Sequence, residues 1–455
     1  MKFLTALILS ASFGASANYL EDNLKRENWN GVEVIWLEDD SYPIYDVSIY
    51  FNAGGFTDSN GKFGETQLAF DLLSTGTTRY KQKEILDSLE FYGVSYQASV
   101  THEFSSYNVS GLVKDAVPTM KMVCHMFRNA TYPDRELKKS VKRIKTGLRN
   151  LPANHGSLAN RIFRQVSLTG TGYENPVGGT LKSLSRISSG DLKKKINFFN
   201  DDVKKRIYIK GPKEMSSLKA VFANDCKWGG GETVVETPKA KKEQRNGSAK
   251  TVYLAVVPKA NQAQIRIGNF MTAKESSSEF ELRDFTSQYL GGGFTSRLMQ
   301  EIRVARGLTY TISSYASEQD NYGRKGINTF TKNQTLVETL NAIREVLEKS
   351  FTEINEEHFQ MAKRYAKGSY LFGLESTSAF LSNLIYFDHV GRDYEEIYKF
   401  PKAIDSLTKP MVMKKASELF NPDEQLIFVL GSNELEKSLK AAGFKVKKVN
   451  YKNFL

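Results

Sequence analysis

The sequence predicts an α+β fold in which one unit of strands and helices occurs twice. A gapless internal repeat at an offset of 220 residues indicates the duplication. Strand and helix patterns follow one another in mixed order, without strict βαβ alternation, which favours layered α+β domains. A chain of 455 residues with 40% hydrophobic residues is long enough for two cores. We therefore expect two homologous domains, each with a mixed, mostly antiparallel sheet and helices packed on it.

The repeat is clearest where a helix precedes a short strand. Ile187–Pro212 aligns with Leu407–Ser432, and each segment has a Ser or Thr N-cap candidate, a lysine-containing helix and a strand ending in glycine. The upstream elements correspond more weakly: strands over 46–51 and 264–267, helices over 65–73 and 280–290, and long strands, clearest over 104–113 in the first half and opening at 309–315 in the second.

The first residues have the pattern of a secretory signal peptide. A basic start at Lys2, an apolar run and the end Ala15-Ser16-Ala17 predict cleavage after Ala17. The apolar run is too short to remain as a membrane span, and no later segment is long and apolar enough. A buried N-terminal helix is the alternative. We expect an exported protein, periplasmic or extracellular, without a stable membrane span.

The domain boundaries follow from these features and from a change in composition. Residues 229–248 contain a glycine triplet, Pro238, a lysine run and Asn246-Gly247, which is typical of an exposed linker. The predicted organisation is a signal peptide over 1–17, an N-terminal domain over 18–228, this linker, and a C-terminal domain over 249–455.

Charge and cysteine content restrict the function further. The formal net charge is +12, but the basic residues form short, scattered runs that are typical of solvated faces. No basic groove with interleaved aromatic residues is apparent, so we expect no nucleic-acid partner. Cys124 and Cys226 lie far apart in sequence. An exported protein can pair them, but the sequence favours two buried free thiols.

Two glycine-containing motifs carry the functional signal. The first reads AGGFTD from Ala53, followed by GETQLAFDLLSTGT from Gly64. The second reads LGGGFTSRL from Leu290, followed by EIRVARGLTY from Glu301. Both motifs resemble the pitrilysin/insulinase family of zinc metallopeptidases, which includes the mitochondrial processing peptidase and core subunits of respiratory complex III. The resemblance covers nearly all of the predicted mature chain, including the repeat, and it implies the two-domain fold of that family.

The resemblance also implies where a zinc site would lie. The family carries an HxxEH signature on its first long helix, and a further Glu downstream completes the site. Residues one and five of that pentapeptide lie one helical turn apart on one face, so two imidazoles can reach one metal ion. The Glu of the signature acts as the base for a zinc-bound water. In this chain the matching pentapeptide reads Gln67-Leu68-Ala69-Phe70-Asp71.

These replacements predict that the chain itself binds no metal. Gln67 is a poor zinc ligand, Phe70 can neither bind metal nor accept a proton, and Asp71 alone makes no site. The region that matches the downstream Glu holds Arg143, Ile144 and Lys145. No catalytic residue is therefore expected in this chain.

The second motif keeps the residues that the resemblance associates with substrate binding. In the family, an Arg and a Tyr seven residues later help to hold the substrate backbone and the oxyanion. Arg303 and Tyr310 match them, and a guanidinium and a phenol are suitable donors to developing negative charge. The alternative is that Arg303 pairs with Glu301 or another acid and that Tyr310 packs in the sheet.

The three glycines before this pair are a second candidate. Gly291, Gly292 and Gly293 match a glycine-rich loop that touches the substrate in the family's non-catalytic processing subunit. The alternative is a tight helix-to-strand turn with positive φ. A phosphate-binding loop is excluded because no Lys-Ser/Thr pair follows at the required place.

The sequence thus predicts a non-catalytic subunit of a zinc peptidase. The expected partner is a homologous HxxEH-bearing subunit, forming a heterodimer in which the zinc lies on the partner. The expected substrate is an unfolded peptide that adds as an extra strand to a sheet edge. Alone, the chain is expected to be inactive. Two alternatives stay open, a structural scaffold and a peptide-binding protein without any proteolytic role.

Overall fold

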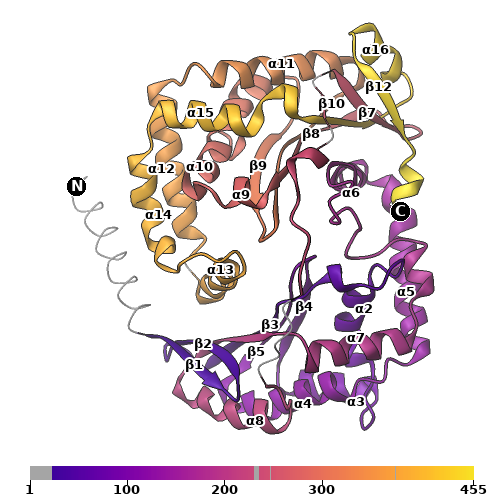
Figure 1. Cartoon of the computed structure of the whole chain (residues 1–455), viewed down its shortest axis with the longest axis vertical. Coiled ribbons are helices and arrows are strands. Elements are labelled where there is room, and N and C mark those ends of the chain that lie inside the picture. Colours follow the sequence, from indigo (N-terminus) through magenta and orange to yellow (C-terminus); the bar gives the residue numbers. More distant parts are fainter. Residues whose placement is uncertain (1–22, 230–234, 246, 249, 375) are drawn as a thin grey trace. The chain divides into compact units, whose positions relative to one another are not determined.

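The computed structural model of the chain describes residues 23–229, 235–245, 247–248, 250–374 and 376–455. The predicted signal peptide over 1–17 lies outside these residues, as do parts of the predicted linker. The described residues form two compact units (Figure 1). One lies within Met1–Ile144, Val177–Glu236 and Leu374–His389, and the other within Lys145–Pro176, Thr237–Gly373 and Val390–Leu455.

A six-stranded sheet forms the centre of the first unit. Its strands, in spatial order, are β1 (Leu24–Trp29), β2 (Val32–Glu38), β6 (Lys205–Gly211), β3 (Ile44–Phe51), β5 (Ser105–Leu112) and β4 (Ser95–Val100). Only the pair β2 and β6 is parallel among these neighbours. The sheet is therefore mixed and mostly antiparallel, as predicted, and β4 forms one of its edges.

Helices pack on one face of this sheet through aromatic side chains. The helices of the unit besides α13 are α2 (Glu65–Asp71), α3 (Gln82–Phe91), α4 (Ala116–Asn129), α5 (Asp134–Asn150, which continues past this unit), α7 (Ser189–Asp201) and α8 (Leu218–Asn224). Phe70 of α2, Phe127 of α4 and Phe199 of α7 each lie within 6 Å of Phe51 of β3, measured between ring centroids. This cluster anchors α2, α4 and α7 to the sheet.

The opposite face carries polar side chains and is covered by α13 (Thr377–His389). Tyr208 donates a hydrogen bond from its hydroxyl to Asp388 Oδ2 at 2.6 Å, and the Tyr50 hydroxyl lies 3.0 Å from His389 Nδ1. All four side chains come from β3, β6 and α13. Helix α13 is thus attached to the first sheet although it lies late in the sequence.

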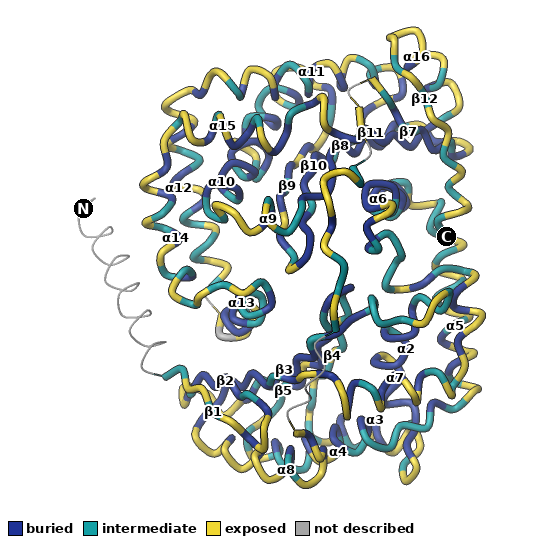
Figure 2. The backbone as a smooth tube through the Cα atoms, in the orientation of Figure 1, coloured by how far each residue is buried: buried dark blue, intermediate teal, exposed yellow. Residues whose placement is uncertain are grey.

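The second unit repeats the same sheet. Its strands, in spatial order, are β12 (Lys445–Val449), β7 (Thr251–Val256), β11 (Leu426–Gly431), β8 (Gln262–Thr272), β10 (Tyr322–Lys332) and β9 (Ile312–Glu318). Its helices are α6 (His155–Ser167), α9 (Ala273–Ser277), α10 (Phe280–Gly291), α11 (Leu336–Ser350), α12 (Glu356–Phe372), α14 (Glu395–Ser406), α15 (Lys409–Phe420) and α16 (Leu435–Ala441). Figure 2 shows the central strands of both sheets, such as β6 and β11, as mainly buried.

Strand β11 carries apolar side chains on both faces of the second sheet. Ile427 and Val429 of β11 join the large core beneath α10, α11 and α15, whereas Phe428 and Leu430 face the other way. Helix α6 covers that second face, where Phe163 packs near Phe428. The uninterrupted apolar sequence of β11 follows from burial on two faces.

The internal repeat is confirmed for the inner strands and the opposite edge of each sheet, whereas the edge strands β1 and β12 differ: β1 pairs antiparallel with β2, and β12 pairs parallel with β7. Helix α7 leads into β6, and α15 leads into β11; each of these strands is third from the same edge of its sheet. The Ser188 hydroxyl accepts a hydrogen bond from the Asp191 N–H at 3.2 Å and so caps α7, whereas the Thr408 side chain makes no such bond. The strand predicted from 309 begins at Ile312 as β9, which corresponds to β4 by its place in the sheet.

Two segments differ from the predicted linear domains. Residues 145–176, which include α6, belong to the second unit, and residues 374–389, which include α13, belong to the first. Helical periodicity identifies an amphipathic helix but does not specify which of two similar sheets the helix covers.

The predicted free thiols are wrong, because the structure pairs Cys124 with Cys226. Cys124 lies on α4 and Cys226 follows α8, which packs against α4. This packing brings the two Cα atoms to 4.4 Å across a sequence separation of 102 residues. The separation of two cysteines in the sequence does not predict the distance between their Cα atoms in the folded protein.

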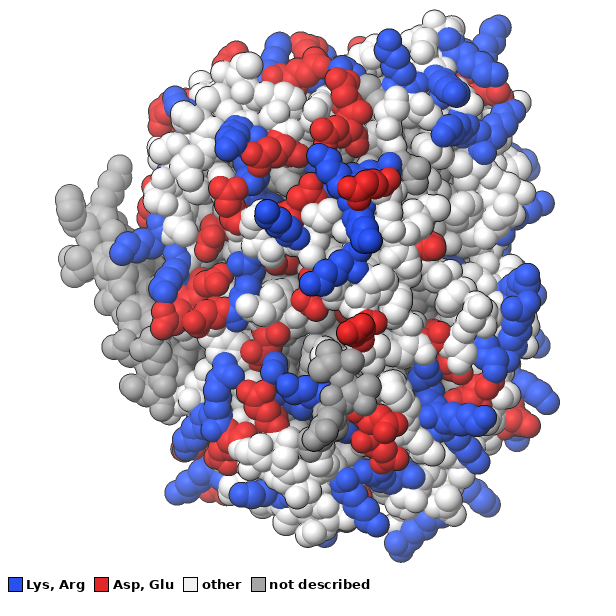
Figure 3. Space-filling view, in the orientation of Figure 1, with Lys and Arg blue, Asp and Glu red and all other residues white. Residues whose placement is uncertain are grey.

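Charge and hydropathy follow the predicted distribution. On the face drawn in Figure 3, basic and acidic side chains are interspersed. Within the residues described by the structure, no helix is both long enough and apolar enough to cross a bilayer.

Candidate functional site

Helix α2 carries the pentapeptide that matches the zinc signature, and a carboxylate fixes the start of this helix. Asp58 accepts hydrogen bonds from the Gly64 N–H at 2.7 Å and from the Thr66 N–H at 2.8 Å. Gly64 adopts φ = 100°, a conformation that favours glycine. These contacts satisfy N–H groups that the first helical turn leaves without intrahelical partners.

Gln67 and Asp71 lie on the same face of α2, as the spacing argument requires. Gln67 Nε2 donates a hydrogen bond to Asp71 Oδ1 at 2.9 Å. Desolvation by the surrounding protein raises the pKa of Asp71, while this hydrogen bond and the charge of Arg143 act in the opposite direction. The amide and the carboxylate thus form a hydrogen-bonded polar pair, and the charge of Arg143 acts on the carboxylate.

Phe70 points into the core of the unit. Its ring is 1% exposed, and its centroid lies 4.9 Å from that of Phe199 and 5.5 Å from that of Phe51. Packing has therefore replaced the general base of the family signature. Among the residues that the structure describes, no group of three or more His, Cys, Asp or Glu side chains has an arrangement that could hold a metal ion.

Arg303 and Tyr310 are brought together in the second unit. Arg303 lies on the π-helical turn η8 (Met299–Ala305), and Tyr310 lies in the loop before β9. The guanidinium carbon of Arg303 is 4.6 Å from the Tyr310 ring centroid and 5.2 Å from that of Phe294. Tyr310 is 71% exposed and Phe294 is 59% exposed. The three side chains form an exposed cation–π stack.

This geometry differs from the alternative in which Arg303 pairs with an acidic residue and Tyr310 packs in the sheet. Within the described part of the chain, no carboxylate lies at ion-pair distance from Arg303, and Tyr310 is outside the strand and solvent-exposed. Two aromatic rings hold the guanidinium in place, while its N–H groups and the phenol hydroxyl stay available as donors. A π-helical turn is rare and often marks a functional site.

The predicted backbone of the glycine triplet is wrong. None of Gly291, Gly292 and Gly293 has a positive φ, and the turn joins α10 to the helical segment that contains η8, not to a strand. Close packing explains the glycines better, because a Cβ atom on Gly291 would lie 2.3 Å from the Ser314 backbone nitrogen. Nothing in this geometry assigns the triplet a substrate contact.

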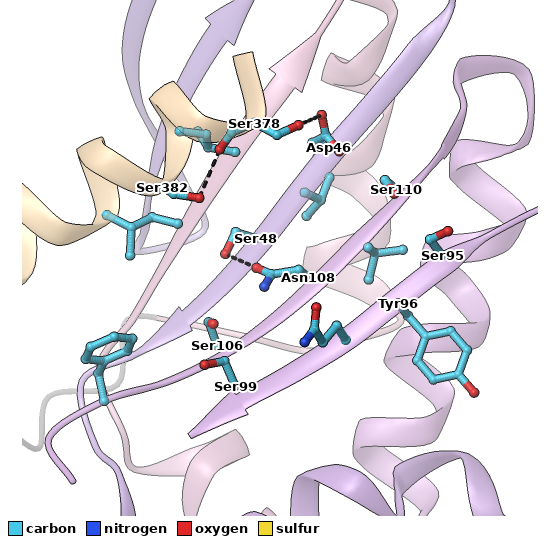
Figure 4. A pocket seen from close by; sticks show the side chains of 16 residues that line it. Asp46, Ser48, Ser95, Tyr96, Ser99, Ser106, Asn108, Ser110, Ser378 and Ser382 are labelled. Atoms are coloured by element: carbon cyan, nitrogen blue, oxygen red, sulfur yellow. Dashed lines mark hydrogen bonds between the residues drawn. The ribbon is translucent and has the colours of Figure 1, made fainter. Parts of the chain in front are cut away.

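A cavity of about 500 Å³, which no sequence motif predicted, lies between the first sheet and α13 (Figure 4). Strands β3, β5 and β4 form its floor, and α13 forms its roof. The signal was present in the segment from Ser105 to Leu112, where the alternating residues Ser106, Asn108 and Ser110 are polar and line the cavity. The missing information was that a distant helix covers this face.

Known proteins match both halves of the chain. Residues 34–180 match the sequence profile described as insulinase (peptidase family M16), and residues 214–365 match that of the peptidase M16 inactive domain. The non-peptidase homolog YmxG of Helicobacter pylori is 22% identical over 396 residues, which cover 86% of this chain and 89% of that protein. The uncharacterized zinc protease YmxG of Bacillus subtilis is 20% identical over 415 residues, which cover 89% and 98%.

A solved structure shares the fold. The peptidase M16 inactive domain from Pseudomonas fluorescens matches with a TM-score of 0.79 and 21% identity, covering 90% of this chain and 98% of that one. The two sequence profiles lie in the two repeated halves in the order that the motifs require. The chain belongs to the insulinase (M16) peptidase family, as a member whose zinc-signature positions hold Gln67, Phe70 and Asp71.

Proposed function

We propose that this chain is the non-catalytic subunit of an exported zinc peptidase and pairs with a homologous subunit that carries HxxEH. One asymmetry carries the proposal. The signature positions are occupied by side chains that bond or pack internally, whereas Arg303 and Tyr310 are exposed and in contact with each other. A chain that had lost every part of the site would have no evident reason to keep this exposed pair.

The chemistry of the pair supports a role in the partner's reaction. Peptide hydrolysis at a metal-bound water passes through an oxyanion, which positioned hydrogen-bond donors stabilise. Arg303 has no carboxylate partner among the described residues, so its charge is not neutralised by a neighbour. The rings of Tyr310 and Phe294 restrict its motion.

The edge of the first sheet supports peptide binding. Strand β4 pairs only with β5 in the described sheet, which leaves one side of its backbone open for an added strand. Helix α2 packs against β4. An extended peptide on this edge would therefore run beside the degenerate pentapeptide, where the catalytic relatives of the family carry their metal ligands.

Two features support export. The first residues have the pattern of a signal peptide. The disulfide between Cys124 and Cys226 fits an oxidising compartment, where such bonds persist.

The test is reconstitution with an exported homologue that carries HxxEH, sought first among the products of neighbouring genes. We expect no peptide hydrolysis by this chain alone and hydrolysis by the pair. Arg303→Ala and Tyr310→Phe should each lower the hydrolysis rate of the pair by about 100-fold, because each removes one donor to the oxyanion.

A matched control is Arg306→Ala, which removes the same charge three residues away. Arg306 instead pairs with Glu345 at 2.8 Å, so its loss should leave the rate within about twofold. If the pair forms and cleaves peptides at an unchanged rate with either site variant, the residues have no role in catalysis. A scaffold or a peptide-binding protein without proteolytic function would then be the better description.

A further inference from the structure

The cavity beneath α13 has an ordered polar floor. Strand register places the side chains that face it in rows across β4, β5 and β3, and these rows are Ser95, Ser110 and Asp46; Gln97, Asn108 and Ser48; and Ser99 and Ser106. Tyr96 of β4 points away from the rows in Figure 4. Its hydroxyl instead donates a hydrogen bond to Ser74 on the other side of the sheet.

The floor is almost free of charge. Asp46 is the single charged residue among the lining residues that the structure describes, and its carboxylate accepts a hydrogen bond from the Ser378 hydroxyl of α13 at 3.0 Å. No Lys or Arg is found among the described residues that line the cavity, although the chain carries a net charge of +12. An anionic group would therefore lose its hydration here without gaining a cation.

Most of the polar groups on the floor have unused hydrogen-bonding capacity. The Ser48 hydroxyl donates to Asn108 Oδ1 at 2.6 Å, which leaves the Asn108 NH₂ group available. The side chains of Gln97 and Ser106 make no hydrogen bond with any other described residue. Ser106 lines the cavity, where a ligand could supply a hydrogen-bond partner for its hydroxyl. Hydroxyls and carboxamides both donate and accept, so their best partners are groups of the same kind.

The roof and the open side restrict the shape of the ligand. Helix α13 contributes Leu381 and Ile385 to the cavity lining, together with Ser378 and Ser382, so the roof is partly apolar. On the other side lies β4, whose cavity-facing residues Ser95, Gln97 and Ser99 are all exposed. A peptide paired with β4 would direct every second side chain toward the same face as these three residues.

We infer that this cavity selects the uncharged polar side chains, namely Ser, Thr, Asn and Gln, of an extended peptide bound along β4. The short apolar stems of these side chains fit beneath Leu381 and Ile385, while their hydroxyl or amide groups pair with the rows on the floor. This inference rests on the proposed function, since it names the class of peptide that the β4 edge accepts.

The test is a set of labelled peptides that match the six-residue length of β4 and differ only at alternate positions, which hold Gln, Glu, Lys or Leu. Binding to the full chain is measured by fluorescence anisotropy at near-physiological salt, which screens the effect of the net charge. We expect the Gln peptide to bind about tenfold more tightly than the Glu and Lys peptides, because burying an unpaired charge is costly. The Leu peptide should also bind more weakly, because it leaves the floor unpaired.

The variant Gln97→Glu distinguishes selective binding of polar side chains from peptide binding at β4 that is independent of side-chain type. Gln97 is exposed on an edge strand, so the variant should fold, and the new carboxylate should shift the preference toward the Lys peptide. The matched control Gln82→Glu places the same charge on α3 and should leave the preference unchanged.

The outcomes separate the two proposals. Equal binding of all four peptides, with no shift in Gln97→Glu, would overturn the inference and leave peptide binding at β4 intact. If no peptide of the set binds at all, the peptide-binding part of the proposed function fails as well.

Discussion

Phe70 shows how one residue can exchange a catalytic position for a structural one. Its ring packs edge-to-face against Phe51, Phe127 and Phe199. Phe70→Ala should lower the free energy of unfolding by about 3–5 kcal/mol, because it leaves a cavity in a close-packed cluster. Chemical denaturation measures this loss. The control Phe91→Ala removes a ring that is 82% exposed and should cost less than about 0.5 kcal/mol. Similar losses in both variants would contradict the packing argument.

The buried residue Lys205 makes the free energy of unfolding depend on pH. Burial lowers its pKa to about 8, and the charge of Arg128 adds to the shift. A lysine in the unfolded chain titrates near 10.4. Between about pH 8 and pH 10 the unfolded chain therefore binds more protons than the folded chain, and stability rises with pH. Below pH 8 the folded protein carries the full destabilisation of a buried ammonium group.

Replacing this lysine tests the argument. Lys205→Met should raise the free energy of unfolding at pH 7 by up to about 3 kcal/mol, and its advantage over the wild type should shrink as pH rises from 8 to 10. Denaturation curves across this range measure the difference. Lys204→Met, at an exposed neighbour, should show no such trend. An advantage that stays constant with pH would exclude titration of Lys205 as its cause.

At the scale of elements, the disulfide links Cys124 of α4 to Cys226, which lies just after α8. Because it closes a long loop, removing both cysteines with Cys124→Ala and Cys226→Ala should lower the free energy of unfolding by about 2–5 kcal/mol. The melting temperature in the presence of a reductant provides the check. Reduction should lower the melting temperature of the wild type and leave that of the double variant unchanged. A wild type that is insensitive to complete reduction would rule out a stabilising role.

Helices α6 and α13 show what an element's sequence leaves open. Both are apolar on one face, which predicts burial but no particular partner. The polar contacts of α13, such as Ser378 with Asp46 and Tyr208 with Asp388, are specific to the first sheet. Because the two residues of each pair lie far apart in the sequence, no local sequence pattern predicts these contacts.

At the scale of the whole molecule, metal content provides a direct test of the subunit proposal. We expect the purified chain to bind less than stoichiometric zinc and the reconstituted pair to contain zinc on the partner, as measured by elemental analysis. A chelator should stop hydrolysis by the pair, yet leave the unfolding midpoint of this chain alone unchanged. One tightly bound zinc per isolated chain would contradict the assignment of the metal to the partner.

Much of the fold could be predicted because repetition and periodicity are local properties. The segments Ile187–Pro212 and Leu407–Ser432 revealed the duplication, and alternation within 46–51 and 264–267 located β3 and β8. The resemblance to the insulinase family located the candidate site, since Gln67, Phe70 and Asp71 fall within the pentapeptide that matches the zinc signature. The cysteine pairing was not predictable, because it depends on the distance between two helices. The φ angles of the glycine triplet were also missed, because contacts such as that of Gly291 with Ser314 are not local.

The sequence by itself determined the duplicated α+β fold, because two matching segments lie 220 residues apart. It also determined the family and the replacement of the zinc ligands, because these depend on residue types at fixed short spacings within motifs. Only the tertiary structure decided that Phe70 fills an aromatic core, that Arg303 and Tyr310 stack in the open, and that α13 covers the polar face of the first sheet. These facts depend on which surfaces meet after the chain folds. Burial and side-chain pairing between distant segments are properties of packing, which local spacing does not encode.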